Sequence, residues 1–253
     1  MNRAILRPAV GARVRPWSRR ALRRLTVRAA VPLAAVSAGV AVLVPASAAP
    51  TPAVAAPAAT HVRVRAALRA LPVAEHSHVA GYDRDKQFGD WITQHGECDT
   101  RAVVLMDESS KPVTTNDYCT VSKGRWYSYY NARYYKNAYG GAVQIDHTVP
   151  VENAWVSGAW RWTKATRVRY YNDLGDPRTL VGVDAHDNEA KGDQDPTTWL
   201  PRHGRCRYER SWVAVKTRWH LSVTSAEKAA LTKLAAACPN PTLTITVAHV
   251  RYR

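Results

Sequence analysis

The chain has 253 residues, of which 46% are hydrophobic, so it is long and apolar enough for one sizeable domain or two small ones with a packed core. The formal net charge is +16, but residues 1–48 carry nine Arg and no acidic residue, and the remainder has 27 basic and 20 acidic residues, a net charge of +7. A surplus of this size suits polyanion binding and equally suits an ordinary basic protein, so charge alone decides no function.

Residues 1–48 are predicted to be an export signal. An Arg-rich stretch leads into an apolar run at 29–44, which is followed by the small-x-small cleavage pattern Ala46-Ser47-Ala48. The run is too short and too rich in Ala to be a convincing membrane span. Residues 18–23 resemble a twin-arginine signal, and a Sec signal with a long basic leader is the alternative. Either signal predicts a secreted, extracellular protein that is cleaved near Ala48 and has no membrane span in its mature form.

Residues 49–80 are dominated by Ala, Pro and Val at their start and are predicted to be a linker. We expect one ordered domain over 81–238, followed by a C-terminal tail over 239–253. The elements within 81–238 predict a small α+β domain with short strands and several helices.

The segment 143–150 carries the clearest chemical signal. A β-prone stretch brings Asp146 and His147 side by side and stops at Pro150, and about 40 residues later Asn188 follows a β-branched strand predicted at 179–183. Phosphodiester hydrolysis needs a base that activates water and positive charge that stabilises the phosphorane and the leaving oxygen. A neutral imidazole is the usual base near pH 7, and an Asp carboxylate with an Asn carbonyl suits Mg²⁺.

Helix signals flank this region. Thr163 is a plausible N-cap for a helix that runs through Tyr171. Asp195-Pro196 is typical of an N-cap followed by Pro at the first helical position.

The C-terminal part predicts a helical hairpin. Apolar residues recur at helical spacing over 206–219, and Thr224-Ser225-Ala226-Glu227 is a capping box that opens a second helix, which Cys238-Pro239 ends. A short connection at about 221–223 makes the two helices antiparallel, so Cys206 and Cys238 should lie together.

We therefore predict a disulfide between Cys206 and Cys238, which leaves Cys98 and Cys119 for a second one. Closure of this second loop, of roughly 20 residues, would contribute about 3 kcal/mol. A four-thiolate zinc site is the alternative, but the paired short Cys spacings that it requires are absent.

The motifs resemble a known family. Ile145-Asp146-His147-Thr148-Val149-Pro150 and Asn188-Glu189-Ala190-Lys191-Gly192-Asp193 resemble the HNH nuclease pattern in its Asp-His…Asn form, as found in secreted bacterial proteins of the DUF1524 type. Elements around Tyr82–Phe88, Cys98–Arg101, Asn172–Leu174 and Asp195–Pro201 also resemble that group. The resemblance covers about 80–238.

The resemblance implies a ββα-metal core, also called the His-Me finger, in which a twisted hairpin and a helix hold one metal. It implies that Asp146 binds the metal, that His147 takes a proton from the attacking water, and that Asn188 is a metal ligand or braces the loop that carries the base. Gln144 stands where an acid is frequent, which would weaken metal binding.

Further candidates have open alternatives. Arg101 would clamp a phosphate or form a salt bridge, Lys191 would neutralise a phosphate or be solvated, and Asp193 would add an acid near the metal or orient its loop. His186 would be a ligand, a phosphate contact or simply exposed. For Asn188 the structural alternative is a helix N-cap, and for Asp146–His147 it is a buried strand end.

These observations predict an exported endonuclease that depends on one divalent metal, Mg²⁺ or else Mn²⁺. The predicted substrate is DNA, with RNA as a second candidate, and little sequence preference is expected. No obligate protein partner is evident. The alternative is a secreted, non-catalytic protein that keeps the HNH fold and binds nucleic acid or another polyanion. A serine or cysteine hydrolase has little support, because the sequence has no nucleophile elbow.

Overall fold

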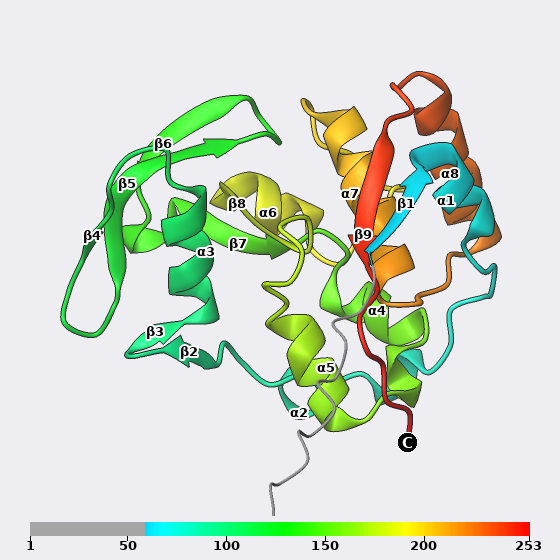
Figure 1. Cartoon of the computed structure of the whole chain (residues 1–253), viewed down its shortest axis with the longest axis horizontal. Coiled ribbons are helices and arrows are strands. Elements are labelled where there is room, and N and C mark those ends of the chain that lie inside the picture. The colour runs from blue at the N-terminus through cyan, green and yellow to red at the C-terminus, as the bar shows by residue number, and fades with distance from the viewer. Residues whose placement is uncertain (1–58) are drawn as a thin grey trace, which may run out of the picture. The chain divides into compact units, whose positions relative to one another are not determined.

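The described part of the chain, residues 59–253 of a computed structural model, combines small antiparallel sheets with helices, in agreement with the α+β class (Figure 1). The strands are β1 (Ala59–Arg63), β2 (Thr93–His95), β3 (Cys98–Asp99), β4 (Thr114–Thr115), β5 (Val121–Ser128), β6 (Arg133–Asn137), β7 (Val143–His147), β8 (Leu180–Asp184) and β9 (Thr242–Thr246). They pair as β1–β9, β2–β3, β4–β5–β6 and β7–β8. The predicted export signal lies outside the described residues.

Eight α-helices lie among the described residues: α1 (Val64–Ala70), α2 (Arg84–Gln87), α3 (Thr100–Glu108), α4 (Val151–Val156), α5 (Lys164–Tyr171), α6 (Ala185–Lys191), α7 (Arg205–Arg218) and α8 (Ser225–Ala236). Single 3₁₀ turns occur at Val79–Gly81, Tyr139–Gly141 and Ala159–Arg161. Within 59–253 no helix has the length and apolar character needed to cross a membrane.

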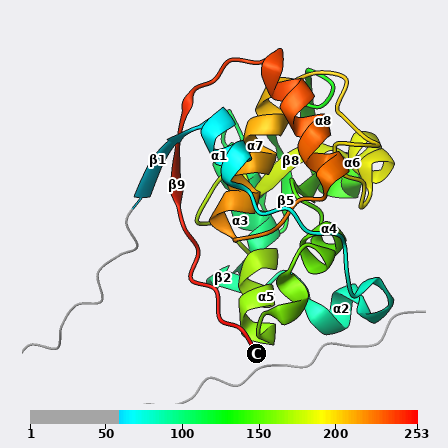
Figure 2. The same cartoon turned by 90° about the vertical axis from the view of Figure 1, so that its right-hand side faces the viewer.

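The predicted linker over 49–80 is wrong from residue 59 onward, because this segment forms β1 and α1. β1 pairs with β9, which itself lies in the predicted tail over 239–253, and Figures 1 and 2 show the two strands side by side. Leu243 and Ile245 of β9 pack with Val64 and with Ala214 of α7 in a small core. Val64, Ala67 and Leu68 of α1 are buried, and the helix packs against α7 and α8.

The β7–β8 pair lies between the two larger hydrophobic cores. Val181 and Val183 of β8 belong to a core rich in Trp and Tyr, whereas Val143 and Ile145 of β7 pack into a second core with α3 and β5. Because apolar side chains cover both faces, this two-stranded sheet is buried. It therefore gives a rigid base for the side chains at its end.

The predicted C-terminal hairpin is present as α7 and α8. Thr224 caps α8 by accepting a hydrogen bond from the backbone N–H of Glu227, and the helices place Cys206 beside Cys238, with a Cα–Cα distance of 5.4 Å. A disulfide joins these two residues, as the hairpin geometry predicted, and a second disulfide joins Cys98 and Cys119. All four cysteines are therefore used, which removes the zinc alternative.

Two other local predictions had different outcomes. Thr163 caps α5 as expected, by accepting from the backbone N–H of Thr166. The helix expected to begin at Asp195-Pro196 is wrong, because the segment makes a single turn in which Oδ1 of Asp195 accepts from the backbone N–H of Thr197. The next Pro, at position 201, disfavours helical backbone in the residue before it, so the turn does not continue.

Candidate active site

The candidate site is built on the unit β7–β8–α6, two antiparallel strands followed directly by a helix. Asp184 ends β8 and caps α6 by accepting from the backbone N–H of Asp187. Along β7, side chains two residues apart share a face, and along α6, side chains three residues apart do so. This register pairs Gln144 with Asn188 and Asp146 with Lys191 across the strand–helix interface.

Asp146 is almost completely buried and holds two hydrogen bonds from side chains. Nζ of Lys191 donates to Oδ1 at 2.8 Å, and the hydroxyl of Tyr130 donates to Oδ2 at 2.5 Å. Burial raises the pKa of the Asp146 carboxyl, whereas the Lys191 ammonium and these two hydrogen bonds lower it. Each carboxylate oxygen keeps a free lone pair, so the group can still take a further partner.

His147 ends β7 and is held in one orientation. Its Nε2 lies 2.9 Å from the backbone carbonyl oxygen of Tyr171. Because a carbonyl oxygen only accepts, Nε2 carries the proton, and Nδ1 is the nitrogen with the free lone pair. The indole of Trp91 lies parallel to the imidazole, with 5.3 Å between ring centroids, and the Tyr171 ring closes in at 4.6 Å.

The imidazole of His147 is neutral at physiological pH. Burial lowers its pKa to about 3, and the positive charges of Arg84 and Lys191 add to this effect. If His147 were the base and had the ordinary His pKa, activity would rise through about pH 6–7. The buried environment changes that expectation, because the base is already unprotonated well below this range.

The three residues predicted to act together line one cleft of about 160 Å³. Its wall consists of Arg84, Ile145, Asp146, His147, Pro150, Val151, Asn188, Gly192 and Asp193. Gly192 ends α6 with a φ of +49°, a conformation that glycine adopts without strain, and this turn brings Asp193 to the cleft. The Asp-His pair of β7 and the Asn of α6 thus meet although they are about 40 positions apart in sequence.

Asn188 lies inside α6 and is not its N-cap, because Asp184 has that role. The amide Nδ2 of Asn188 donates to Oε1 of Gln144 at 2.8 Å, and the amide of Gln144 donates in turn to Glu189. With its NH₂ group engaged, Asn188 has its amide oxygen available to the cleft. Gln144 therefore orients Asn188. The sequence had indicated only that Gln144 replaces an acid that is frequent in the family, and it did not suggest this role.

Three of the further candidates lie away from the cleft wall. The guanidinium of Arg101 is half-buried and points to the backbone carbonyls of Ala138 and Val143, at 3.4 and 3.5 Å, and it does not line the cleft. His186 is exposed, and its Nδ1 lies 4.0 Å from Oδ1 of Asp187. Lys191 is fully buried behind Asp146, where it cannot be solvated or reach a phosphate.

Asp193 and Arg84 complete the polar wall of the cleft, and Glu152 lies next to Asp193 outside it. Asp193 is exposed, and its charge and hydrogen bond raise the pKa of Glu152, after the larger effect of burial. Arg84 donates to the hydroxyl of Tyr171 at 2.7 Å, which fixes a guanidinium on the wall of the cleft. Sequence reasoning did not assign Arg84 or Tyr130 to the site. The segment from Tyr82 to Phe88, which resembles a family element, was the available signal for Arg84.

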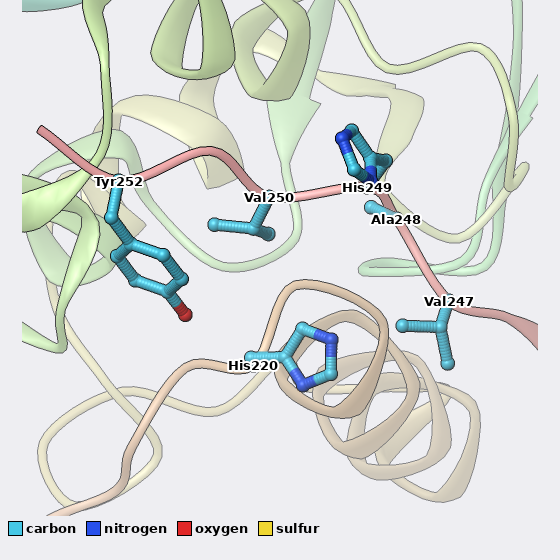
Figure 3. A pocket seen from close by; sticks show the side chains of 6 residues that line it. All are labelled: His220, Val247, Ala248, His249, Val250 and Tyr252. Carbon is cyan, nitrogen blue, oxygen red and sulfur yellow. The ribbon is translucent and has the colours of Figure 1, made fainter.

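Larger hollows lie elsewhere in the described residues. One of about 450 Å³ is lined by His220 and the C-terminal segment Val247–Tyr252, and Figure 3 shows its two imidazoles among apolar side chains. Its wall has no acidic residue, so it lacks the acid, base and amide that the smaller cleft combines. Size therefore does not identify the reactive site here.

Comparison with known proteins places the chain in a nuclease-type family. The model of the family "GmrSD restriction endonucleases, C-terminal domain" matches residues 102–234, a range that includes β7, β8 and α6. The chain belongs to this family. An uncharacterized secreted protein of Arthroderma benhamiae is 42% identical over 173 residues, which cover 68% of this chain and 82% of that protein. No solved structure matches this chain.

Proposed function

We propose that the protein is an exported, metal-dependent endonuclease that hydrolyses phosphodiester bonds of DNA, with RNA as a second candidate substrate, and has little sequence preference. The observation that supports this most directly is the convergence of Asp146, His147 and Asn188 in one cleft. Membership of a nuclease-type family and a relative described as secreted support the same proposal. The β7–β8–α6 unit would then be a ββα-metal core.

His147 would act as the general base. Its Nδ1 would accept a proton from the attacking water, while its Nε2–H stays on the carbonyl of Tyr171 and holds the ring in place. The stacked Trp91 indole restricts rotation of the ring, so the base is already oriented before substrate binds. As the proton arrives, the imidazolium would be stabilised by the same Tyr171 carbonyl.

Arg84 would bind the scissile phosphate. A guanidinium presents several N–H donors in a planar fork that matches phosphate oxygens, and the hydrogen bond to Tyr171 already orders this side chain. Arg84 thus takes the phosphate-binding role for which the sequence had suggested Arg101, whose guanidinium faces backbone carbonyls away from the cleft.

The residues present fit a hard divalent cation. Asp146 offers carboxylate lone pairs, and Asn188 offers an amide oxygen at the same cleft. Mg²⁺ retains most of its own waters and is commonly held by one or two protein oxygens, and Mn²⁺ accepts similar ligands. When bound, the ion would supply positive charge for the phosphorane and the leaving oxygen. The Lys191 ammonium competes for Asp146, so we expect modest metal affinity.

A plasmid-cleavage assay tests the proposal. Cleavage should require Mg²⁺ or Mn²⁺, stop in EDTA, and fall by about 10²–10⁴-fold in His147→Ala. His186→Ala is the matched control, because this exposed imidazole lies on α6 but does not line the cleft. Cleavage that persists unchanged in His147→Ala would remove the assignment of the base. Binding of nucleic acid without cleavage under every metal would favour the non-catalytic alternative.

A further inference from the structure

The hairpin formed by β5 and β6 carries an exposed pair of aromatic rings. Tyr127 and Tyr134 lie directly opposite each other in the register, with 5.0 Å between ring centroids, and are 43% and 55% exposed. Figure 1 shows this hairpin with β4 beside α3, on the other side of β7 and β8 from β1 and β9. The hairpin thus exposes two large aromatic rings to solvent.

The opposite face of the hairpin already provides its packing. Trp126 and Tyr135 face inward, and Trp126 is buried and donates its indole N–H to the carbonyl of Leu105 on α3. Since neighbouring residues of a strand point to opposite faces, this register leaves Tyr127 and Tyr134 on the outside. A cross-strand pair of rings contributes only about 0.2–1 kcal/mol to a hairpin, and two adjacent exposed rings also offer a flat surface on which a ligand can stack.

The charge around the pair indicates an anionic ligand. Residues 118–145 contain no Asp or Glu, and two of their cations, Arg125 and Lys136, lie on the same face of the hairpin as the two tyrosines. The guanidinium of Arg125 lies over the Tyr134 ring, 4.1 Å from its centroid, so positive charge and aromatic surface form one patch. We call Tyr127, Tyr134, Arg125 and Lys136 the aromatic–basic patch.

The hairpin that carries the patch also contacts a residue of the candidate active site. The tip of the hairpin, residues 129–132, contains Tyr130, whose hydroxyl donates to Asp146. A single residue pair, Ser128 with Arg133, separates this buried tip from Tyr127 and Tyr134. A ligand on the patch would therefore lie close to the point where the hairpin supports the predicted metal ligand.

We infer that the aromatic–basic patch binds unpaired nucleotides of a single DNA strand and leads that strand toward the cleft. Cations track the phosphates of any nucleic acid, but a tyrosine ring can stack only on a base whose face is not covered by a neighbouring pair. The patch thus distinguishes a single strand from a duplex. This inference rests on the proposed function, because it takes nucleic acid as the substrate.

Fluorescence anisotropy in EDTA tests the inference without cleavage. The probes are a labelled DNA strand of about 20 nucleotides, long enough to span the patch, and the duplex of the same sequence. Tyr127→Ala/Tyr134→Ala should weaken single-strand binding about tenfold or more, and duplex binding far less. Tyr127→Phe/Tyr134→Phe keeps both rings, and Tyr252→Ala removes an exposed tyrosine elsewhere, so each should stay within about twofold of the wild type.

A second variant separates stacking from folding. Tyr127→Ile/Tyr134→Ile keeps a bulky apolar pair for the hairpin and lacks a ring, so it should melt like the wild type and still lose single-strand affinity. Unchanged single-strand affinity in both ring-free variants, or an equal loss for single strand and duplex, would overturn the inference. Ring-dependent binding without cleavage under any metal would keep this inference and remove the endonuclease. Metal-dependent cleavage of the single strand at the same rate in the wild type and in both ring-free variants would keep the endonuclease and remove this inference.

Discussion

Lys191 gives the sharpest test of how the candidate site is held together. Its side chain has no solvent exposure, and its ammonium donates to Asp146 at 2.8 Å and to the backbone carbonyl of His147 at 3.0 Å. Lys191→Met keeps most of the side-chain volume but removes both bonds. Tyr130 would then be the remaining side-chain donor to the buried Asp146 carboxyl.

The magnitude follows from the burial of both partners. Removing one partner of a buried ion pair costs about 3–5 kcal/mol, whereas an exposed pair contributes about 0–1 kcal/mol. The total free energy of unfolding of a domain is about 5–15 kcal/mol, so the variant should fold but be much less stable. For about 200 residues, each kcal/mol lowers Tm by about 2–4 °C, which gives a fall of about 6–20 °C.

Urea denaturation followed by tryptophan fluorescence measures this loss. Lys233→Met, which removes an exposed lysine of α8, is the matched control and should change the free energy of unfolding by less than about 0.5 kcal/mol. Because Lys191 no longer competes for Asp146, Mg²⁺ should stabilise Lys191→Met more than the wild type. A loss below about 1 kcal/mol would refute the view that Lys191 compensates a buried Asp146. Equal stabilisation of both proteins by Mg²⁺ would refute the competition between lysine and metal.

Three further outcomes are expected. Gln144→Ala releases the amide of Asn188, so the rate of plasmid cleavage should fall about tenfold or more with little change in Tm; an unchanged rate would show that Asn188 needs no orientation. Burial raises the pKa of Glu108 to about 7 from 4.5, so this carboxyl stabilises the fold below about pH 4.5 and loses that contribution as pH rises through about 7. The stability of Glu108→Gln relative to the wild type should therefore increase by about 2 kcal/mol between pH 5 and pH 8 in denaturation curves, and a constant difference would contradict the shift. Cys206→Ser/Cys238→Ser opens a loop of 32 residues and should lower the free energy of unfolding by about 3–4 kcal/mol, measured with Cys98–Cys119 intact.

Most predictions that depended on neighbouring residues agree with the structure, and the helix expected at Asp195-Pro196 is the exception. The α7–α8 hairpin, its cap at Thr224 and the Cys206–Cys238 bridge follow from periodicity and capping, which act over a few positions. The Asp146–His147 motif and Asn188 were found for a related reason. The end of one strand and the helix that follows its partner strand are close in space because of the connectivity alone.

Predictions that required knowing which distant segments touch were wrong or absent. Arg101 and Lys191 have the charge for phosphate binding, but packing turns one toward backbone carbonyls and buries the other. Tyr130 was overlooked because its contact with Asp146 depends on where the tip of the β5–β6 hairpin lies.

The sequence by itself determined which residues have the chemistry: an acid beside an imidazole at a strand end, an amide on the next helix, and four cysteines in two bridges. Only the tertiary structure decided that β1 pairs with β9, that Arg84 reaches the cleft, and that burial keeps His147 neutral. The physical reason is that local sequence patterns encode backbone preference and which side chains share a face of a helix or strand. Desolvation and long-range contacts depend instead on the whole packed core, which no short segment encodes.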